Sequence, residues 1–170
     1  MEIALSSERL YLKEMKVTDA QNLFLLNSDI EVIQYTGDVM FTSIDDALNL
    51  IENYDQYEKY KTGRLSLFDK ASDEYIGWCG LKYLEETGKF DIGYRLLKKH
   101  WGKGYATEAA IVCLDYGFNT LELEEIIGTA MIENTASINV FKKLGMKYDT
   151  DEPCGNKPGV IYKIKKSEWK

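Results

Sequence analysis

The chain has 170 residues, of which 45% are hydrophobic and 29% are charged, the balance of an ordinary globular domain. Its formal net charge of −7 argues against nucleic acid as a partner. No apolar run approaches the ~18 residues of a membrane span, and the first residues do not resemble a secretory leader. We therefore expect one domain over residues 1–170, located in the cytoplasm and without a membrane partner.

The cysteine and histidine content argues against a disulfide framework or a metal site. Cys79, Cys113 and Cys154 are odd in number and far apart in the sequence. His100 is the single histidine, so a metal cluster would lack partners. We predict reduced thiols and no metal, and we expect His100 to be a solvated neighbour of the loop that follows it.

The first third of the chain predicts one strand followed by helices. Residues 8–15 alternate between apolar and polar side chains, as a half-buried strand does. Two capping boxes, Thr18–Gln21 and Ser43–Asp46, indicate where helices begin. We expect helices from Thr18 to about residue 27, over residues 30–35 with an end at Gly37, and from Ser43 to about residue 62.

The rest of the chain predicts a strand meander that leads into a strand–helix–strand unit. Expected strands lie at residues 64–68, 74–84, 90–97, 125–132, 146–150 and 160–165, with helices from residue 105 and over residues 135–144. This order is an α/β layout. We predict a mixed, mostly antiparallel sheet of about seven strands flanked by helices.

The stretch Trp101–Ala106, with the sequence WGKGYA, has the properties of an anion cradle. Its glycines precede a helix that starts near Tyr105, so the first N–H groups of that helix point outward and can approach a ligand closely. The helix dipole adds partial positive charge there, and Lys103 adds a full charge. A pyrophosphate is the anion that suits this arrangement best.

Two well-known phosphate-binding motifs can be compared with this stretch. A P-loop needs four residues between its glycines and Lys-Ser/Thr after the second, and neither is present. A dinucleotide fingerprint needs a third small residue where Thr107 stands, although Glu133 lies roughly where its acidic residue would be. A nucleotide-dependent oxidoreductase therefore stays as the weaker alternative.

The whole stretch resembles the GCN5-related N-acetyltransferase superfamily, whose signature is Arg/Gln-x-x-Gly-x-Gly/Ala. Trp101, Gly104 and Ala106 stand at the marked positions, with Trp in place of the usual first residue. The flanking sequences Asp91–Tyr94 and Thr107–Ala109 are similar to those of the ribosomal-protein-alanine acetyltransferase branch. The resemblance covers nearly the full length of the chain. It implies the fold of this superfamily, a site formed by a strand, a loop and a helix, and acetyl-CoA as cosubstrate.

The resemblance also implies which residues bind the cofactor. Asn134 opens a second signature, Asn134–Ser137 followed by Lys143–Met146, and its side chain would meet the pantetheine arm. Without the family, Asn134 is simply a favourable helix N-cap, and both roles can hold together. Backbone groups at the end of the central strand would pair with the pantetheine amides. The expected cofactor-binding residues are Leu96, Leu97, Trp101, Gly102, Lys103, Gly104, Tyr105, Ala106 and Asn134.

Acetyl transfer to an amine requires a base, because a free alkylammonium has a pKa near ~10. Asp91 stands where the resembling branch carries a glutamate base, and its side chain is one methylene shorter. A salt bridge is the equally weighted structural alternative for Asp91. Many members place a proton-donating tyrosine where this chain has Phe141, and Ser137 can instead hydrogen-bond the departing sulfur. Asp91 and Ser137 are therefore the catalytic candidates.

Tyr35 and Gly37 match the Tyr-x-Gly of the branch, a segment that borders the acceptor cleft. The resemblance implies transfer of an acetyl group from acetyl-CoA to a primary amine, by direct attack in a ternary complex. A protein N-terminus and a small-molecule amine are both open as acceptors, and a homodimer is left open as well. A catalytically weak CoA-binding module is the second alternative, supported by Phe141 and the shortened Asp91.

Overall fold

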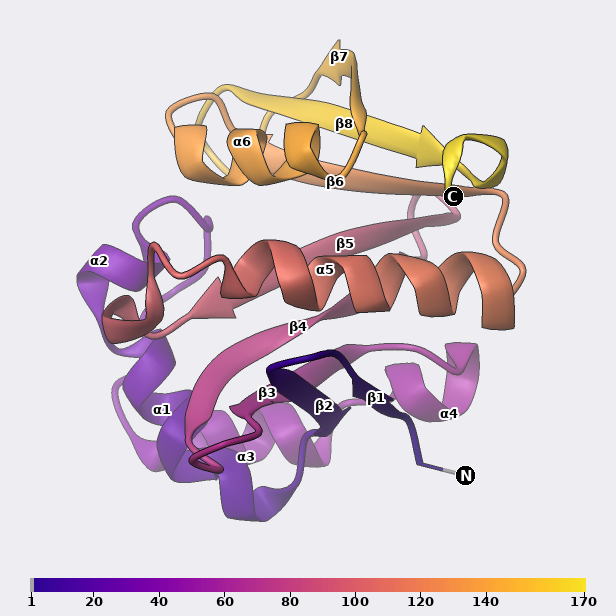
Figure 1. Cartoon of the computed structure of the whole chain (residues 1–170). Helices are drawn as coiled ribbons and strands as arrows, with labels where there is room; N and C mark the ends of the chain where they lie inside the picture. Colours follow the sequence, from indigo (N-terminus) through magenta and orange to yellow (C-terminus); the bar gives the residue numbers. More distant parts are fainter. Residues whose placement is uncertain (1) are drawn as a thin grey trace.

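A computed structural model describes residues 2–170, in which eight strands form one mixed sheet (Figure 1). The order across the sheet is β1-β2-β3-β4-β5-β6-β8-β7. Every neighbouring pair is antiparallel except β5 and β6, which run parallel. The strands are β1 (Ala4–Ser6), β2 (Leu10–Glu14), β3 (Arg64–Asp69), β4 (Tyr75–Leu84), β5 (Lys89–Leu96), β6 (Glu125–Met131), β7 (Lys147–Asp151) and β8 (Gly159–Lys165).

This architecture confirms the predicted α/β fold with a mostly antiparallel sheet. The prediction of about seven strands lacked β1, a strand of three residues that pairs with β2 at the edge of the sheet. Its sequence, Ala-Leu-Ser, is too short to show a period. The helices are α1 (Ala20–Asn27), α2 (Ile30–Ile33), α3 (Ile44–Glu52), α4 (Gln56–Tyr60), α5 (Tyr105–Asp115) and α6 (Thr135–Lys143).

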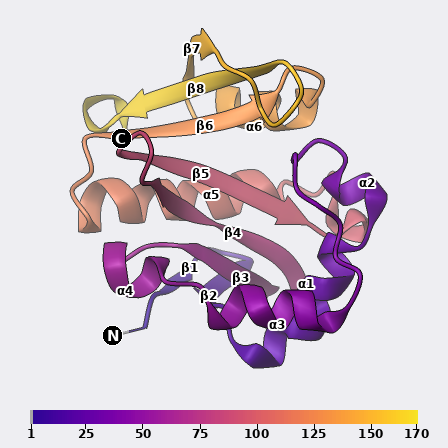
Figure 2. The same ribbon diagram turned by 180° about the vertical axis from the view of Figure 1, so that it is seen from behind.

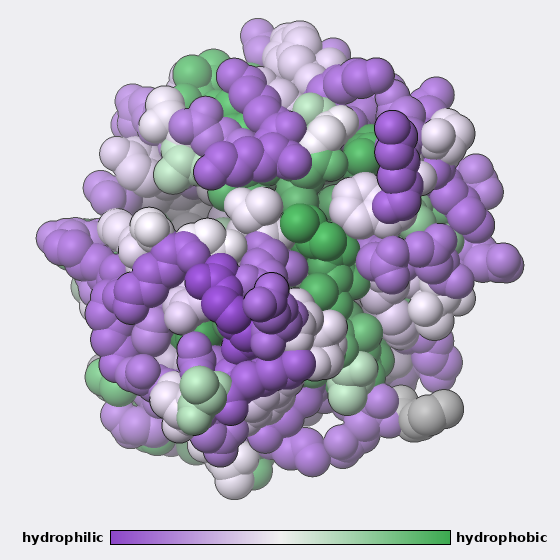
Figure 3. Space-filling model, viewed as in Figure 1, coloured by the Kyte–Doolittle hydropathy of each residue, from purple (hydrophilic) through white to green (hydrophobic). Residues whose placement is uncertain are grey.

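The helices cover both faces of the sheet and create a core on each. Helices α5 and α6 lie on one face, and α1, α3 and α4 lie on the other (Figures 1 and 2). Buried side chains of α5 and α6 pack against the sheet around Leu81, Ile92 and Ile126. A second cluster joins Leu23 and Leu26 of α1 to Phe68 and the helices around it. Figure 3 shows that the α5–α6 face is mostly hydrophilic, with a narrow band of apolar side chains near its centre.

Two helix predictions need correction, and each has a local cause. The Thr18 cap is wrong, because a 3-10 turn over Val17–Asp19 precedes α1 and Asp19 accepts a hydrogen bond from the Lys16 N–H at 3.0 Å. The Ser43–Asp46 box is confirmed. The predicted helix from Ser43 to residue 62 is broken between α3 and α4. The phenol of Tyr54 accepts a hydrogen bond from the Arg64 N–H at 2.7 Å, which ties this break to the start of β3.

The parallel strands β5 and β6 separate soon after they meet. Within residues 2–170 they pair only at Asp91 and Ile127, whereas β4 follows β5 as far as Leu96. One edge of β5 is therefore unpaired from Ile92 to its end. Because β5 and β6 run parallel, their carboxyl ends lie at the same side of the sheet, where α5 and α6 begin. None of the helices in residues 2–170 is long and apolar enough to cross a membrane.

Candidate active site

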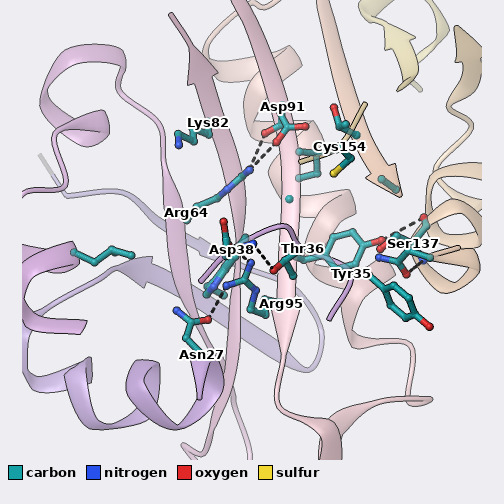
Figure 4. Close-up of a pocket in the computed structure, with 18 of the residues that line it drawn as sticks. Asn27, Tyr35, Thr36, Asp38, Arg64, Lys82, Asp91, Arg95, Ser137 and Cys154 are labelled. Carbon is teal, nitrogen blue, oxygen red and sulfur yellow. Dashed lines mark hydrogen bonds and ion pairs between the residues drawn. The ribbon is translucent and has the colours of Figure 1, made fainter. Parts of the chain in front are cut away.

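A cavity of about 610 Å³ lies where β5 and β6 separate (Figure 4). Successive residues of a strand point to opposite faces of the sheet, yet Tyr94 and Arg95 both line this cavity. The wall on the α6 side includes Ser137 and Phe141, and the wall on the other side includes Arg64 and Trp78. The cavity therefore passes through the sheet and connects its two faces.

Asp91 lies in this cavity as one half of an ion pair. Its Oδ2 is 2.6 Å from Nη2 of Arg64, and the two side chains are only 13% and 16% exposed. Arg64 also donates to the backbone carbonyls of Gly80 and Asp91, so its guanidinium is held firmly. Burial raises the pKa of the Asp91 carboxyl, and the charge of Arg64 opposes that rise. The salt bridge that the sequence analysis gave as the structural alternative for Asp91 is therefore present.

Asn134 and Ser137 lie at the start of α6, facing β5. The Asn134 side chain accepts a hydrogen bond from the Ser137 N–H at 3.2 Å, which is the predicted N-cap. The Tyr94 hydroxyl donates to the Ser137 carbonyl at 3.3 Å across the gap between the strands. The structure therefore brings Asp91, Asn134 and Ser137 into the wall of one cavity.

Phe141 and Tyr94 share this region but differ in chemistry. Phe141 is 2% exposed, and its ring fills the space above Gly128, where a Cβ would lie 2.6 Å from the ring. It has no proton to give. Tyr94 carries a hydroxyl in the gap itself, and burial raises its pKa, which keeps it protonated at neutral pH. Sequence reasoning treated Tyr94 as part of a motif and missed its hydroxyl in the gap.

The end of β5 limits one predicted cofactor contact. The Leu97 N–H donates to the Ile76 carbonyl and the Leu97 carbonyl accepts from the His100 N–H, both at 2.9 Å. The Leu97 N–H is therefore not available to a pantetheine amide, and the Leu97 carbonyl has one acceptor position left. Leu96 faces the open edge, where its carbonyl accepts the indole N–H of Trp101 at 2.9 Å. Trp101 thereby fastens the glycine loop to the end of β5.

The loop itself has the geometry that an anion cradle needs. Gly102 and Gly104 adopt φ of +73° and +79°, the left-handed region that favours glycine. A Cβ on Gly102 would meet nothing within 4 Å, so its backbone faces open space. Gly104 caps α5, whose first N–H groups have no partner within the helix. With Lys103 beside them, these donors fit a pyrophosphate.

The side chains of the next two residues point elsewhere. The Tyr105 hydroxyl donates to Asp69 at 3.2 Å, and Ala106 packs against the core. Only their backbone groups can therefore contribute to the cradle. His100 differs from the prediction, because the residue is only 5% exposed and is therefore buried and not solvated. Neither ring nitrogen has a hydrogen-bond partner among residues 2–170, and burial lowers the pKa of His100, so the imidazole is neutral near pH 7.

The turn between β1 and β2 braces the cradle. Glu108, in the first turn of α5, accepts hydrogen bonds from the Ser7 hydroxyl at 2.7 Å and from the Arg9 N–H at 2.9 Å. It also forms an ion pair with Nε of Arg9 at 2.6 Å. Arg9 in turn donates to the Lys103 carbonyl at 3.0 Å. This brace fixes where the helix and the loop begin, and sequence reasoning missed it because Arg9 is distant in the chain.

Glu108→Gln should lower the free energy of unfolding by about 1–2 kcal/mol, because Arg9 is 45% exposed and water screens part of the ion pair. Burial alone would raise the pKa of Glu108, but the Arg9 and Ser7 hydrogen bonds outweigh it and hold that pKa below its usual value. The loss should therefore be complete near pH 7 and should shrink as the pH falls below about 4.

Urea unfolding of the parent protein and of Glu108→Gln, at pH 7 and at a pH below about 4, measures this difference in the free energy of unfolding. Glu86→Gln, at an exposed position in the turn after β4, is the matched control and should change little at either pH. A Glu108→Gln deficit that is the same at both pH values would show that the carboxylate charge is not what holds the brace.

The predicted acceptor residues take different positions. Tyr35 lines the cavity, as expected for a residue that contacts the acceptor. Gly37 does not line the cavity. It has a φ of +76° and packs against Gly155: a Cβ added to Gly155 would lie 3.4 Å from the Gly37 Cα. Gly37 is thus a support of the loop that covers the cavity. The loops after α2 and after β7 meet at these two glycines.

Comparison with known proteins agrees with this geometry. The family model described as an acetyltransferase (GNAT) domain matches residues 9–147. The uncharacterized N-acetyltransferase p20 of Bacillus licheniformis is 35% identical, over 97% of each chain. A crystal structure of a GNAT-family acetyltransferase from Bacillus anthracis superposes with a TM-score of 0.83 at 27% identity, covering 98% of this chain and 100% of that one.

The chain therefore belongs to the GNAT acetyltransferase family, as its sequence indicated. The spermidine N(1)-acetyltransferase of Escherichia coli K12 is a more distant relative, 23% identical over 85% of this chain and 76% of that protein. The finer resemblance to the ribosomal-protein-alanine branch stays a prediction.

Proposed function

We propose that the chain transfers an acetyl group from acetyl-CoA to a primary amine by direct attack in a ternary complex. The observation that carries this proposal is the cavity that crosses the sheet between β5 and β6. One side of it adjoins the unpaired edge of β5, and the other is a polar chamber under the loop around Tyr35. A donor and an acceptor can therefore enter from opposite faces and meet in the gap.

The residues at the end of β5 suit coenzyme A. The unpaired edge of β5 around Tyr94 and Leu96 offers backbone groups to the amides of a pantetheine arm, as an added strand would use them. The loop from Trp101 to Gly104 and the first turn of α5 offer N–H groups and Lys103 to the pyrophosphate. When bound, acetyl-CoA supplies the thioester that the amine attacks.

As the C–N bond forms and the C–S bond breaks, the amine must lose a proton and the departing thiolate must be stabilised. Asp91 takes the proton of the attacking amine, directly or through a water molecule. Its burial favours this role because a raised pKa strengthens the base, whereas the ion pair with Arg64 weakens it. The Ser137 or Tyr94 hydroxyl can donate a hydrogen bond to the departing sulfur, which leaves as a thiolate because its conjugate thiol has a pKa of only about 8.5.

The acceptor is a small-molecule amine or a protein N-terminus. The name of the Escherichia coli relative, a spermidine acetyltransferase, supports a small-molecule amine. The cavity volume is also in the range typical of small-molecule sites.

Acetyl-CoA should protect the folded chain. At ~100 times its dissociation constant a ligand adds about 2.7 kcal/mol to the free energy of unfolding. For a chain of this size, that is a rise in melting temperature of roughly 5–10 °C, measurable by scanning fluorimetry. NADH and ATP should give much smaller shifts, because the loop lacks a dinucleotide fingerprint. Equal or larger protection by NADH would favour the oxidoreductase alternative.

A further inference from the structure

Arg95 has a hydrogen-bond donor that no described residue of the chain uses. Its side chain is only 8% exposed and lines the cavity (Figure 4). Nη1 donates to the Asn27 side chain at 2.7 Å and Nη2 to Asp38 at 2.5 Å. Its Nε is buried and has no partner within residues 2–170. An unsatisfied buried donor on a charged group is costly, so its retention in a cavity wall points to a ligand acceptor atom.

The charges around the cavity favour an anion over a second cation. Its described lining holds three cations, Arg64, Lys82 and Arg95, and two carboxylates, Asp38 and Asp91, a surplus of one positive charge. Each carboxylate is already within 2.6 Å of an arginine. No carboxylate of the described lining is therefore free to bind the additional ammonium groups of a polyamine.

Arg95 is also held in place before a ligand arrives. Its guanidinium lies 5.1 Å from the ring centroid of Trp78, and Asn27 fixes its far edge. Asp38, in contrast, is 61% exposed and comes from the loop that covers the cavity. It contacts Nη2 alone, whereas a carboxylate approaching side-on can use both Nε and Nη2. The site is thus preorganised for a carboxylate and only partly filled.

We infer that the acetyl acceptor is a primary amine that also carries a carboxylate, which binds Nε of Arg95. This inference rests on the proposed acetyl transfer and deepens it by naming the class of acceptor. Arg95 and Asp91 share a face of β5 and are four residues apart, about 13 Å between Cα atoms. Dipeptides and ω-amino acids span such a site better than a single α-amino acid does.

The test compares acceptors that differ only at the carboxylate. Glycylglycine and γ-aminobutyrate are assayed beside their carboxamides, with spermidine as the polyamine, and kcat/KM is measured by free-thiol release from acetyl-CoA. The acids should exceed their amides by roughly 10- to 100-fold, the usual value of a charge-assisted hydrogen bond. Amides or spermidine that are acetylated as well as the acids by the parent protein would overturn the inference.

Variants at Arg95 separate a specific contact from general charge. Arg95→Met should bring the acid-to-amide ratio close to one without changing the protection by acetyl-CoA, and Arg95→Lys should keep part of the preference. The ratio in the parent protein decides the question even where a variant does not fold. A preference for acids that Arg95→Met leaves intact would assign the anion site to other residues.

A binding measurement distinguishes failure of this inference from failure of the proposed function. With CoA present, the acids should raise the melting temperature and their amides should not. If no amine releases thiol, the proposed acetyl transfer fails, but protection by acids alone still supports an anion site at Arg95. Equal protection by acid and amide, or none by either, overturns the site.

Discussion

Asp91→Asn should reduce the acetylation rate near pH 7 by about 10²–10⁴-fold, the usual contribution of a positioned general base. Asparagine keeps the size of the side chain and can still accept a hydrogen bond from Arg64, but it cannot take up a proton at neutral pH. Raising the pH should restore part of the rate, because more of the amine then arrives deprotonated. The protection by acetyl-CoA should not change.

The parent protein should show the matching pH dependence. Because burial raises the pKa of Asp91, its carboxylate is lost at a higher pH than an exposed aspartate, and kcat/KM should fall earlier on acidification. Ser137→Ala should cost less than Asp91→Asn, since a thiolate can leave without full protonation. An Asp91→Asn protein that acetylates at the parent rate near pH 7 would reduce Asp91 to the structural partner of Arg64.

Gly104→Val should abolish measurable acetyl-CoA binding, a loss of at least about 100-fold in affinity. Gly104 caps α5 at φ of +79°, where a branched side chain is strained by roughly 1–3 kcal/mol. The new side chain would also stand where a pyrophosphate must approach the backbone N–H groups. The expected measurement is loss of thermal protection by acetyl-CoA, with a folded protein of moderately lower melting temperature.

Gly88→Val provides the matched control. Gly88 has φ of +71° in the turn between β4 and β5, and its Cβ would meet only the Tyr83 hydroxyl at 3.6 Å. The Gly88→Val substitution imposes the same kind of backbone strain at a position away from the Trp101–Gly104 loop. It should therefore lower the melting temperature while acetyl-CoA still binds. Normal binding by Gly104→Val, or equal loss in both variants, would show that the loop is not the phosphate site.

The regular elements were predictable because local patterns determine them. The strand-to-helix passage around Trp101–Ala106 and the cap at Asn134 follow from glycine, apolar spacing and N-cap preference, and the structure has both. The short edge strand β1 and the break after α3 depend on distant partners, such as the Arg64 N–H that binds Tyr54. No local pattern contains that information.

The candidate site was predictable only where it coincides with a motif. Asp91 and Ser137 were found, and the structure places both in one cavity. The partners that determine their chemistry were not, because Arg64 lies on β3 and Arg95 contacts Asn27 of α1 and Asp38 of the loop after α2. One signal for Arg95 was available in the sequence. Asp91, Gly93 and Arg95 stand at every second position of the central strand, so their side chains share one face of the sheet.

Initial-rate kinetics of thiol release test the central claim most directly. Acetyl-CoA and a primary amine are varied together, and the acetylated product is identified by mass spectrometry. Direct attack in a ternary complex predicts thiol release that depends on the amine, with double-reciprocal lines that intersect. Parallel lines would instead indicate a covalent acetyl-enzyme. Tight acetyl-CoA binding without amine-dependent release for any acceptor would contradict the account and leave the chain a CoA-binding module.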